Sequence, residues 1–492
     1  MGAGILTTYS QIANVAGIHG LLTYTITGAI PIFLFSFFGP MIRRRCPDGF
    51  VLTEWVYHRY GILTMLYLSG FTILTMFLFM VSELAAISLA IEAVTGVNTT
   101  ASTVVECLVT TIYTAIGGFK VSFLTDTIQA AFVLLVAIIG TITYGTQIHI
   151  DRELYNETKP QMLEANKLGW QLLYILFVAI VTNDCFLSGF WLRTFAAKTD
   201  KDLFIATGIA SIVAAIICTL VGLPGILGVW TGDLIIGDDN GENAFFILLA
   251  KMDNWTIGVL LLFFVAISTC TFDSLQSGMT STISNDIFRN RIPLVYIRII
   301  VCIIIVPCII VALKVADDVL EIYLIADLVS SAIIPTIFLG LSDYFFFLTG
   351  WEVMTGGFGA LLGVFIFGTV YYGDAKDGGK LLLIWNGMYD PEDWGAFGAF
   401  VIAPFASILI AFIVAAIRIS GLYVYSRITG KPFTALDKPA KQIYVDDNFL
   451  GNEAGQVVVE EEEEEEEGDQ LCQEHFSLAN HESGSIKKDY ES

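Results

Sequence analysis

TIGVLLLFFVAISTCTFDSLQSGMTSTI, residues 256–283, combines the two features that decide the fold of this chain. The stretch begins with a long apolar run, and as a whole it exceeds the roughly 20 residues that a helix needs to cross a bilayer. From Cys270 to Ser281, small polar residues recur every three or four positions, so they share one face of a helix. We expect a membrane-spanning helix whose polar face meets other parts of the protein rather than lipid.

The composition of the whole chain is that of a membrane protein. Of its 492 residues, 55% are hydrophobic and only 15% are charged, whereas soluble domains are about a quarter charged. In water such a chain would expose large apolar patches and aggregate. The composition therefore excludes a soluble enzyme, a nucleic-acid-binding protein and a disordered scaffold.

Apolar stretches of this kind recur along most of the chain. About twelve are long enough to cross a bilayer, and they lie at 1–16, 18–41, 61–95, 100–117, 124–148, 168–190, 202–228, 256–283, 294–314, 318–341, 353–372 and 395–417. We therefore predict an all-α polytopic protein with about 12 transmembrane helices, embedded in membrane lipid.

Basic residues and glycosylation sequons predict the orientation of these spans. Lys and Arg near span ends stay in the cytoplasm, and they gather at alternate connections: Arg43, Arg44, Arg45, Lys120, Arg193, Lys198, Lys201, Arg289 and Arg291. The intervening connections hold three Asn-x-Ser/Thr sequons, at Asn98, Asn156 and Asn254. A single sequon can arise by chance, but glycans are added only outside, so all three together support one topology.

The composition changes near residue 418. Residues 1–417 form the predicted membrane domain, and residues 418–492 are polar and include an unbroken run of glutamates from Glu460 to Glu467. Such a segment is too charged to bury a core. We expect a disordered, cytoplasmic tail, which serves either as a docking site for a trafficking partner or as a solvated segment without a specific partner.

The span 261–283 holds the first of three polar groups inside predicted spans, where a polar or charged side chain costs a few kcal/mol. Its polar face consists of Cys270, Thr271, Asp273, Ser274, Ser277, Gly278, Ser281 and Ser284. The carbonyl of Ile267 lies one helical turn before Cys270 and Thr271. A carbonyl and a hydroxyl can thus be presented together to a small cation. The structural alternative is that these small residues form interhelical hydrogen bonds.

The other two groups contain carboxylates. Thr182-Asn183-Asp184, followed by Ser188-Gly189, interrupts a long apolar run, and a helix broken there would expose backbone groups to a central site, as in many transporters. Asp327, Ser330 and Ser331 share one face of a later span. For both groups, a satisfied packing contact between helices is the alternative.

Catalytic motifs are missing from the sequence. It contains no His-Glu-x-x-His, no Gly-x-Ser-x-Gly and no Walker loop, and its five histidines are dispersed. We therefore expect no enzymatic activity, no cofactor and no metal centre beyond a possible sodium ion.

Three motifs resemble those of the sodium:solute symporter family. They are YTAIGGFKVSFLTDTIQ at 113–129, CTFDSLQSGMTSTISNDIF at 270–288 and FWLRTFAAKTDKD at 190–202, the last with Leu192 where the family has Gln. The resemblance covers roughly residues 1–420. It implies the leucine-transporter type of fold, with two inverted repeats of five helices and a binding site at mid-membrane beside broken helices.

The resemblance also implies functional residues. Ile267, Cys270 and Thr271 match the family's sodium site, and Asp126 matches an acid on the inward ion path. Asn183 and Asp184 lie near the family's substrate gate. Tyr24 lies near another substrate contact. Cys270 replaces a serine, and sodium prefers oxygen ligands to sulfur, so both sodium and the proton are candidate coupling ions.

The beginning of the chain departs from the family pattern. MGAGIL falls where the broken middle of the first core helix is expected, so we expect that helix to be incomplete. Either an upstream segment was omitted or the chain is a shortened relative.

The most specific hypothesis is a plasma-membrane symporter for a small polar solute, moved by alternating access. VTGVN at 94–98 and the motif after it look closest to the urea and polyamine branch of fungi and plants, and urea is the solute we expect. The alternatives are a nutrient sensor that signals through the acidic tail, a channel, and a shortened relative without function.

Overall fold

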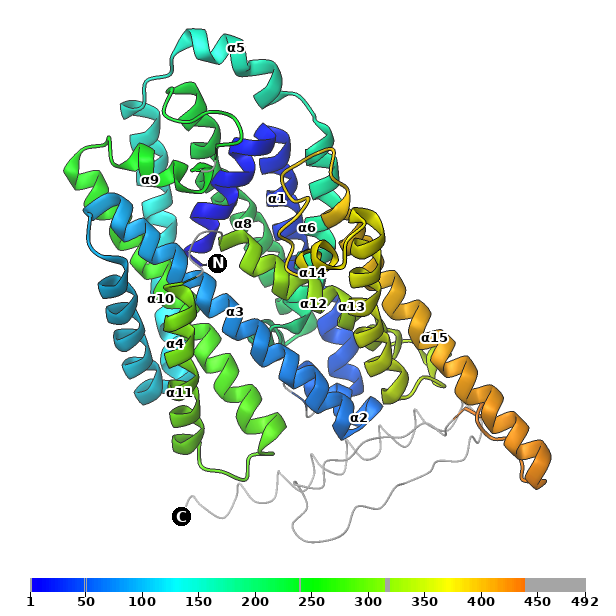
Figure 1. Ribbon diagram of the computed structural model, residues 1–492. Coiled ribbons are helices and arrows are strands. Elements are labelled where there is room, and N and C mark those ends of the chain that lie inside the picture. Colours follow the sequence, from blue (N-terminus) through cyan, green and yellow to red (C-terminus); the bar gives the residue numbers. More distant parts are fainter. Residues whose placement is uncertain (1, 48, 50, 239, 315–318, 439–492) are drawn as a thin grey trace, which may run out of the picture. The chain divides into compact units, whose positions relative to one another are not determined.

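The described part of the chain is built of helices. A computed structural model describes residues 2–47, 49, 51–238, 240–314 and 319–438, without the side chains of 115–124 and 126. These residues form α1 (Gly4–Arg45), α2 (Leu52–Tyr60), α3 (Ile62–Thr95), α4 (Thr99–Gln147), α5 (Arg152–Leu163), α6 (Lys167–Phe186), α7 (Ser188–Ala196), α8 (Asp200–Trp230), η1 (Gly241–Asn243), α9 (Ala244–Leu249), α10 (Asn254–Thr282), the π-helix η2 (Ile283–Ile287), α11 (Leu294–Ala312), α12 (Val319–Leu339), η3 (Asp343–Phe345), α13 (Gly350–Tyr372), α14 (Ala375–Leu381) and α15 (Gly395–Thr429) (Figure 1).

The predicted all-α membrane architecture is confirmed. Among the described residues, 10 helices are long and apolar enough to span a membrane. The number is lower than the predicted twelve because two pairs of predicted spans each fall within one labelled element. Runs 1–16 and 18–41 correspond to the two helices of α1, which meet at the kink at Gly17, and runs 100–117 and 124–148 belong to α4.

α1 changes direction at Gly17. Its backbone there has φ 61° and ψ −156°, which is not helical, and Figure 1 shows the two arms of α1 in dark blue. A Cβ atom at this position would lie 2.4 Å from the carbonyl oxygen of Met162 in α5. Glycine is therefore required both by the backbone conformation and by the close approach of the neighbouring chain.

A second interruption separates α6 from α7. Leu187 has an extended backbone between Phe186 and Ser188, the adjoining ends of the two helices. The indole of Trp191 donates a hydrogen bond of 2.8 Å to the carbonyl of Cys185 and thereby satisfies a carbonyl freed by the break. The helix thus breaks close to the point that the sequence predicted, just after the polar residues 182–184.

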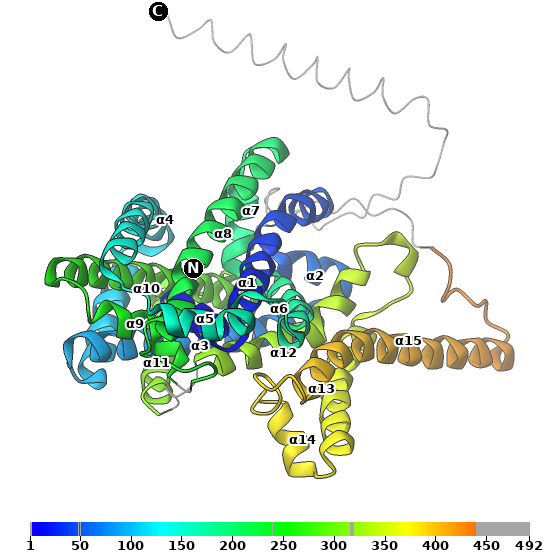
Figure 2. The ribbon, with the colours of Figure 1, turned by 90° about the horizontal axis from the view of Figure 1, so that it is seen from above.

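These interrupted helices lie at the centre of the helical core. α1 packs against α6 and α8, and α12 packs against α3 and α6, while α10 packs against α3 and α4. Small residues allow the closest approach: a Cβ on Gly225 of α8 would lie 2.0 Å from the carbonyl oxygen of Ser10. α13, α14 and α15 lie together at one side of this core (Figure 2).

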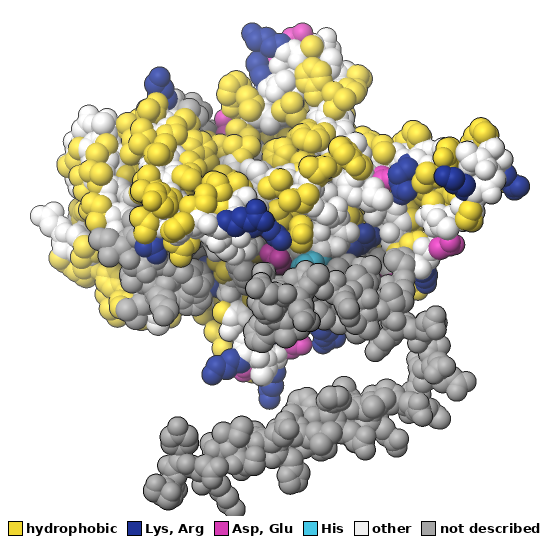
Figure 3. Space-filling view, turned by 90° about the horizontal axis from the view of Figure 1, so that it is seen from below, with side chains coloured by type: hydrophobic (Ala, Val, Ile, Leu, Met, Phe, Trp, Pro, Cys, Tyr) yellow, Lys and Arg dark blue, Asp and Glu magenta, His cyan; other side chains and the backbone are white. Residues whose placement is uncertain are grey.

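The outer faces of the helices carry large apolar side chains. Ile212 of α8, Ile303 of α11 and Phe405 of α15 are each 64% exposed. In a bilayer such side chains contact lipid, so their exposure needs no protein partner. Hydrophobic side chains cover much of the face seen from below in Figure 3, with scattered Lys and Arg between them.

Arginines at the end of α1 join distant parts of the chain. Arg43 and Arg44 form ion pairs with Asp200 at the start of α8, and Arg45 pairs with Asp343. The ends of α1 and α12 and the start of α8 therefore lie at one end of the bundle, which we call the basic end. The three sequon asparagines, Asn98, Asn156 and Asn254, are exposed.

The predicted boundary between membrane domain and tail falls inside a helix. The compact unit comprises Met1–Ala435, and the predicted boundary at 417/418 falls inside α15. Arg418 there pairs with the buried carboxylate of Glu352 in α13 and donates a second hydrogen bond to the carbonyl of Phe347. The glutamate run 460–467 lies outside the described residues.

Gly17→Ala tests the requirement for a glycine in α1. The substitution forces a side chain into a left-handed conformation, which costs about 1–3 kcal/mol, and places its Cβ against Met162. We expect a lower thermal unfolding temperature of the purified protein in detergent. Gly258→Ala, in a helix with open space around it, is the matched control; equal stability of the two variants would contradict this reading.

The predicted orientation can be tested with the sequons. If the connections that hold Asn98, Asn156 and Asn254 face the outside, each Asn→Gln substitution should remove one glycan from protein made in a eukaryotic cell. Mass spectrometry after deglycosylation would count the occupied sites. Occupation of an engineered sequon beside Arg43 would reverse the assignment.

Candidate functional site

Two of the three polar groups predicted from the sequence meet in the structure. The amide of Asn183 on α6 donates a hydrogen bond to the carboxylate of Asp327 on α12. The hydroxyl of Thr182, the residue before Asn183, lies 3.0 Å from that of Ser330, one turn after Asp327, and Ser330 also donates a hydrogen bond of 2.9 Å to the carbonyl of Asp327. The packing alternative is thus realised for Thr182 and Ser330, and the same contacts place Asp327 beside the break between α6 and α7.

Asp184 gives this region a second carboxylate. It interacts electrostatically with Asp327 and with Tyr9 of α1. Its side chain is half-buried, and within the described part of the chain it has no hydrogen-bond or ion-pair partner. Two carboxylates without a basic partner are costly inside a membrane. Either a bound cation or protonation of the carboxylates would remove this cost.

Two stacked tyrosines lie close to these carboxylates. The rings of Tyr9 and Tyr24 on α1 are nearly parallel, with centroids 3.9 Å apart and planes 4° apart. The hydroxyl of Tyr24 lies 3.4 Å from that of Thr8, and Tyr24 interacts electrostatically with Asp327. Aromatic faces attract cations and pack against apolar methylene chains.

Glu83 of α3 is a third carboxylate of this region. One oxygen accepts a hydrogen bond of 2.7 Å from the hydroxyl of Tyr323 on α12, and the other accepts one of 2.7 Å from the backbone amide of Ala3. The latter contact caps the N-terminal end of α1, where a negative charge is favourable. Tyr323 also interacts with Asp327 and Tyr24. We call Tyr9, Tyr24, Glu83, Asp184, Tyr323 and Asp327 the central cluster.

Tyr9, Glu83 and Tyr323 were missed by the sequence analysis. A signal for Glu83 existed, because it is the only charged residue between 62 and 91 in a long apolar span. Tyr9 and Tyr323 carry no such signal, since tyrosine is uncharged and is enriched near the ends of membrane spans for other reasons. Their role depends on which helices α1 and α12 contact.

The predicted ion-site residues lie elsewhere, on α10. Ile267 is buried in an apolar cluster that also includes Leu6 of α1. Cys270 and Thr271 are half-buried. Asp126 belongs to α4, but its side chain lies outside the described residues. The assignment of these four residues to an ion site stays a prediction.

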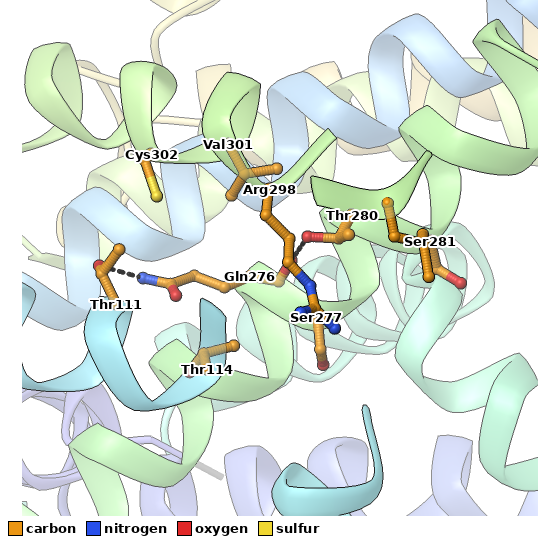
Figure 4. Close-up of a pocket in the computed structure, with 10 residues that line it drawn as sticks. Thr111, Thr114, Gln276, Ser277, Thr280, Ser281, Arg298, Val301 and Cys302 are labelled. Atoms are coloured by element: carbon orange, nitrogen blue, oxygen red, sulfur yellow. Dashed lines mark hydrogen bonds between the residues drawn. The ribbon is translucent and has the colours of Figure 1, made fainter. Parts of the chain in front are cut away.

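The polar face of α10 meets α4, α7 and α11. The carboxylate of Asp273 accepts hydrogen bonds from Thr114 at 3.1 Å and Thr125 at 3.3 Å, and Ser274 accepts one of 3.1 Å from Arg193. These contacts realise the interhelical alternative for part of the face. The next turns instead border a cavity of about 150 Å³ between α4, α10 and α11, lined by Thr111, Thr114, Gln276, Ser277, Thr280, Ser281, Leu294, Arg298, Val301 and Cys302 (Figure 4).

Comparison with known proteins shows the family. A model of the sodium:solute symporter family matches residues 1–365. The chain is 64% identical to the spermidine transporter DUR31 of Candida albicans over 440 residues, 89% of this chain and 84% of that protein. It is 30% identical to the urea-proton symporter DUR3 of Oryza sativa subsp. japonica over 155 residues, 30% of this chain and 22% of that protein.

A solved structure shows the same fold. A Na+-coupled sialic acid symporter in a substrate-bound, outward-open state has a TM-score of 0.62 and 15% sequence identity, and the likeness covers 85% of this chain and 87% of that one. The expected transporter fold is confirmed, and the family and relatives are transporters rather than enzymes. The chain belongs to the sodium:solute symporter family.

Proposed function

We propose that this protein is an ion-coupled symporter that carries a polyamine such as spermidine across the plasma membrane by alternating access. The observation that carries the proposal is the half-buried carboxylate of Asp184, which has no partner among the described residues and lies beside Asp327. A bound cation would supply the missing counter-charge.

The chemistry of the central cluster favours a polyamine over the urea that we expected from the sequence. Polyamines carry ammonium groups separated by methylene chains, and carboxylates bind ammonium groups through charge-assisted hydrogen bonds. The stacked rings of Tyr9 and Tyr24 offer an apolar and cation-attracting surface for the methylenes beside such a group. Urea is neutral and would leave both Asp184 and Asp327 uncompensated.

The surrounding helices suit a site that opens to alternate sides. Asn183 and Asp184 lie one turn before the extended residue Leu187, and Tyr9 and Tyr24 lie on opposite sides of the change of direction at Gly17. In transporters with inverted repeats, substrates bind at such interruptions, and one group of helices rocks against the other around them. Motion at either interruption would therefore change access to the carboxylates.

The relatives support this choice. The relative named as a spermidine transporter is similar along most of both chains, whereas the relatives named as urea transporters match about a third of this chain or less. Urea nevertheless remains the competing solute, so both must be assayed with the same protein preparation.

Asp184→Asn tests the proposed substrate. Loss of one charge-assisted hydrogen bond, worth about 1.5–3 kcal/mol, should raise the KM for spermidine uptake roughly tenfold to a hundredfold. The matched control is Asp202→Asn, an exposed acid on α8, which should leave the KM unchanged. Uptake of urea but not spermidine by the wild-type protein would contradict the proposal, as would an unaltered KM in Asp184→Asn.

Substitutions of Tyr24 test the aromatic wall. Tyr24→Leu removes the ring that stacks on Tyr9 and should weaken spermidine binding by about 0.5–2 kcal/mol. Tyr24→Phe keeps the ring and loses only the 3.4 Å contact with Thr8, so it should bind nearly as well as the wild type. Competition with unlabelled spermidine measures both affinities. Equal losses in the two variants would assign the effect to the hydroxyl instead.

A further inference from the structure

Glu106 of α4 is a buried carboxylate outside the central cluster. One of its oxygens accepts a hydrogen bond from the hydroxyl of Ser268 on α10. Its other oxygen, Oε2, is buried and has no hydrogen-bond partner within the described part of the chain. Nor does any Lys, Arg or His in that part form an ion pair with Glu106. An ionised carboxylate in such a place is costly, whereas its protonated form is not.

Two hydroxyls without a hydrogen-bond partner among the described residues lie at a height in the bundle similar to that of Glu106. α3 and α4 pack against each other as a hairpin, and a hydrogen bond between Ser88 and Thr103 fixes their register. Ser82 lies six residues before Ser88 on α3, and Thr110 lies seven residues after Thr103 on α4. Because the two helices of the hairpin run in opposite directions, both residues lie about 9–10 Å from that contact on the same side of it. The hydroxyls of both are buried without a partner among the described residues. Thr110 also lies one turn after Glu106, on the same face of α4.

A polar route leads from this level towards the basic end. Thr111 and Thr114, which follow Thr110 on α4, line the cavity of about 150 Å³ with Gln276 and Ser277 of α10 (Figure 4). The side chain of Gln276 donates a hydrogen bond of 2.9 Å to Thr111 across this cavity. The hydroxyl and amide groups on its walls can hold water molecules, which can carry a proton.

Glu106 also interacts electrostatically with a residue of the central cluster. It interacts with Glu83 across the α3–α4 interface, and Glu83 accepts the hydrogen bond from Tyr323, which interacts with Asp327. Like charges disfavour each other's ionised forms. A change in the charge of Glu106 is therefore felt in the region where we place the substrate.

We propose that Glu106 binds and releases the proton that drives transport. This inference rests on the proposed function as a symporter and names its coupling ion. With the site open to the outside, a proton adds to the carboxylate of Glu106; with the site open to the basic end, the same proton passes to water in the cavity. Among the described residues, the other charged groups that face this path are Glu83 on α3, Asp273 on α10 and Arg298 on α11.

Glu106→Gln separates coupling from transport itself. The experiment uses the full chain in proteoliposomes, with the membrane potential clamped at zero because spermidine is itself a cation. With the outside acidic, the wild type should accumulate spermidine, and the variant should accumulate at least tenfold less. Exchange of labelled for unlabelled spermidine, which needs no net proton movement, should persist in the variant. Glu92→Gln, an exposed acid at the end of α3, should behave as the wild type.

Ser268→Ala provides a second variant if Glu106→Gln does not fold. Loss of the hydroxyl removes a hydrogen bond that stabilises the charged carboxylate, so the pH of half-maximal uptake should rise. Full accumulation by Glu106→Gln, or an unchanged pH profile in Ser268→Ala, would overturn the inference. Accumulation by the wild type that requires sodium and does not depend on the pH gradient would also overturn the inference. That result would favour the predicted ion site at Cys270 and Thr271. Absence of spermidine exchange in the wild type would overturn the proposed function itself.

Discussion

A carboxylate in the hydrocarbon core of a bilayer depends on the protein for its partner, because lipid supplies neither hydrogen-bond donors nor counter-charge. Asp327 receives a hydrogen bond from Asn183, Glu83 receives two from Tyr323 and Ala3, and Asp273 receives two from threonines. Each of these contacts joins separate helices. The acids therefore link α12 to α6 and α3, and α10 to α4, whereas Asp184 has no such contact among the described residues.

The breaks in α1 and between α6 and α7 follow from the same constraint. A straight helix satisfies its backbone groups internally, so an interruption in the membrane needs compensation. Trp191 satisfies the carbonyl of Cys185 after the break at Leu187. Gly17 permits a backbone that other residues avoid. These local solutions leave polar groups of α1, α6 and α12 facing one another, which is what a cation site requires.

The sequence predicted the helical architecture well because apolar length is a direct consequence of bilayer thickness. It also identified Asn183, Asp184, Asp327 and Ser330, since polar groups in apolar spans are conspicuous. It did not show that these four residues meet, because their meeting depends on contacts between α6 and α12, which lie far apart in the chain. Glu83 and Glu106 were visible as acids within apolar spans, but nothing local distinguishes a helix-capping acid from one with an unsatisfied oxygen.

The length of α15 is a second feature that the local sequence did not reveal. The change of composition near residue 418 is real, yet Arg418 continues α15 because its charge is compensated by Glu352 of α13. Compensation of this kind is a tertiary property and leaves no trace in the local sequence.

A cryo-electron microscopy structure of the full chain with spermidine would test the central claim most directly. The account predicts elongated density with one end within hydrogen-bonding distance of Asp184 and its adjoining part against the rings of Tyr9 and Tyr24. Density for spermidine at another place in the bundle, with the region around Asp184 and Asp327 unchanged, would contradict it.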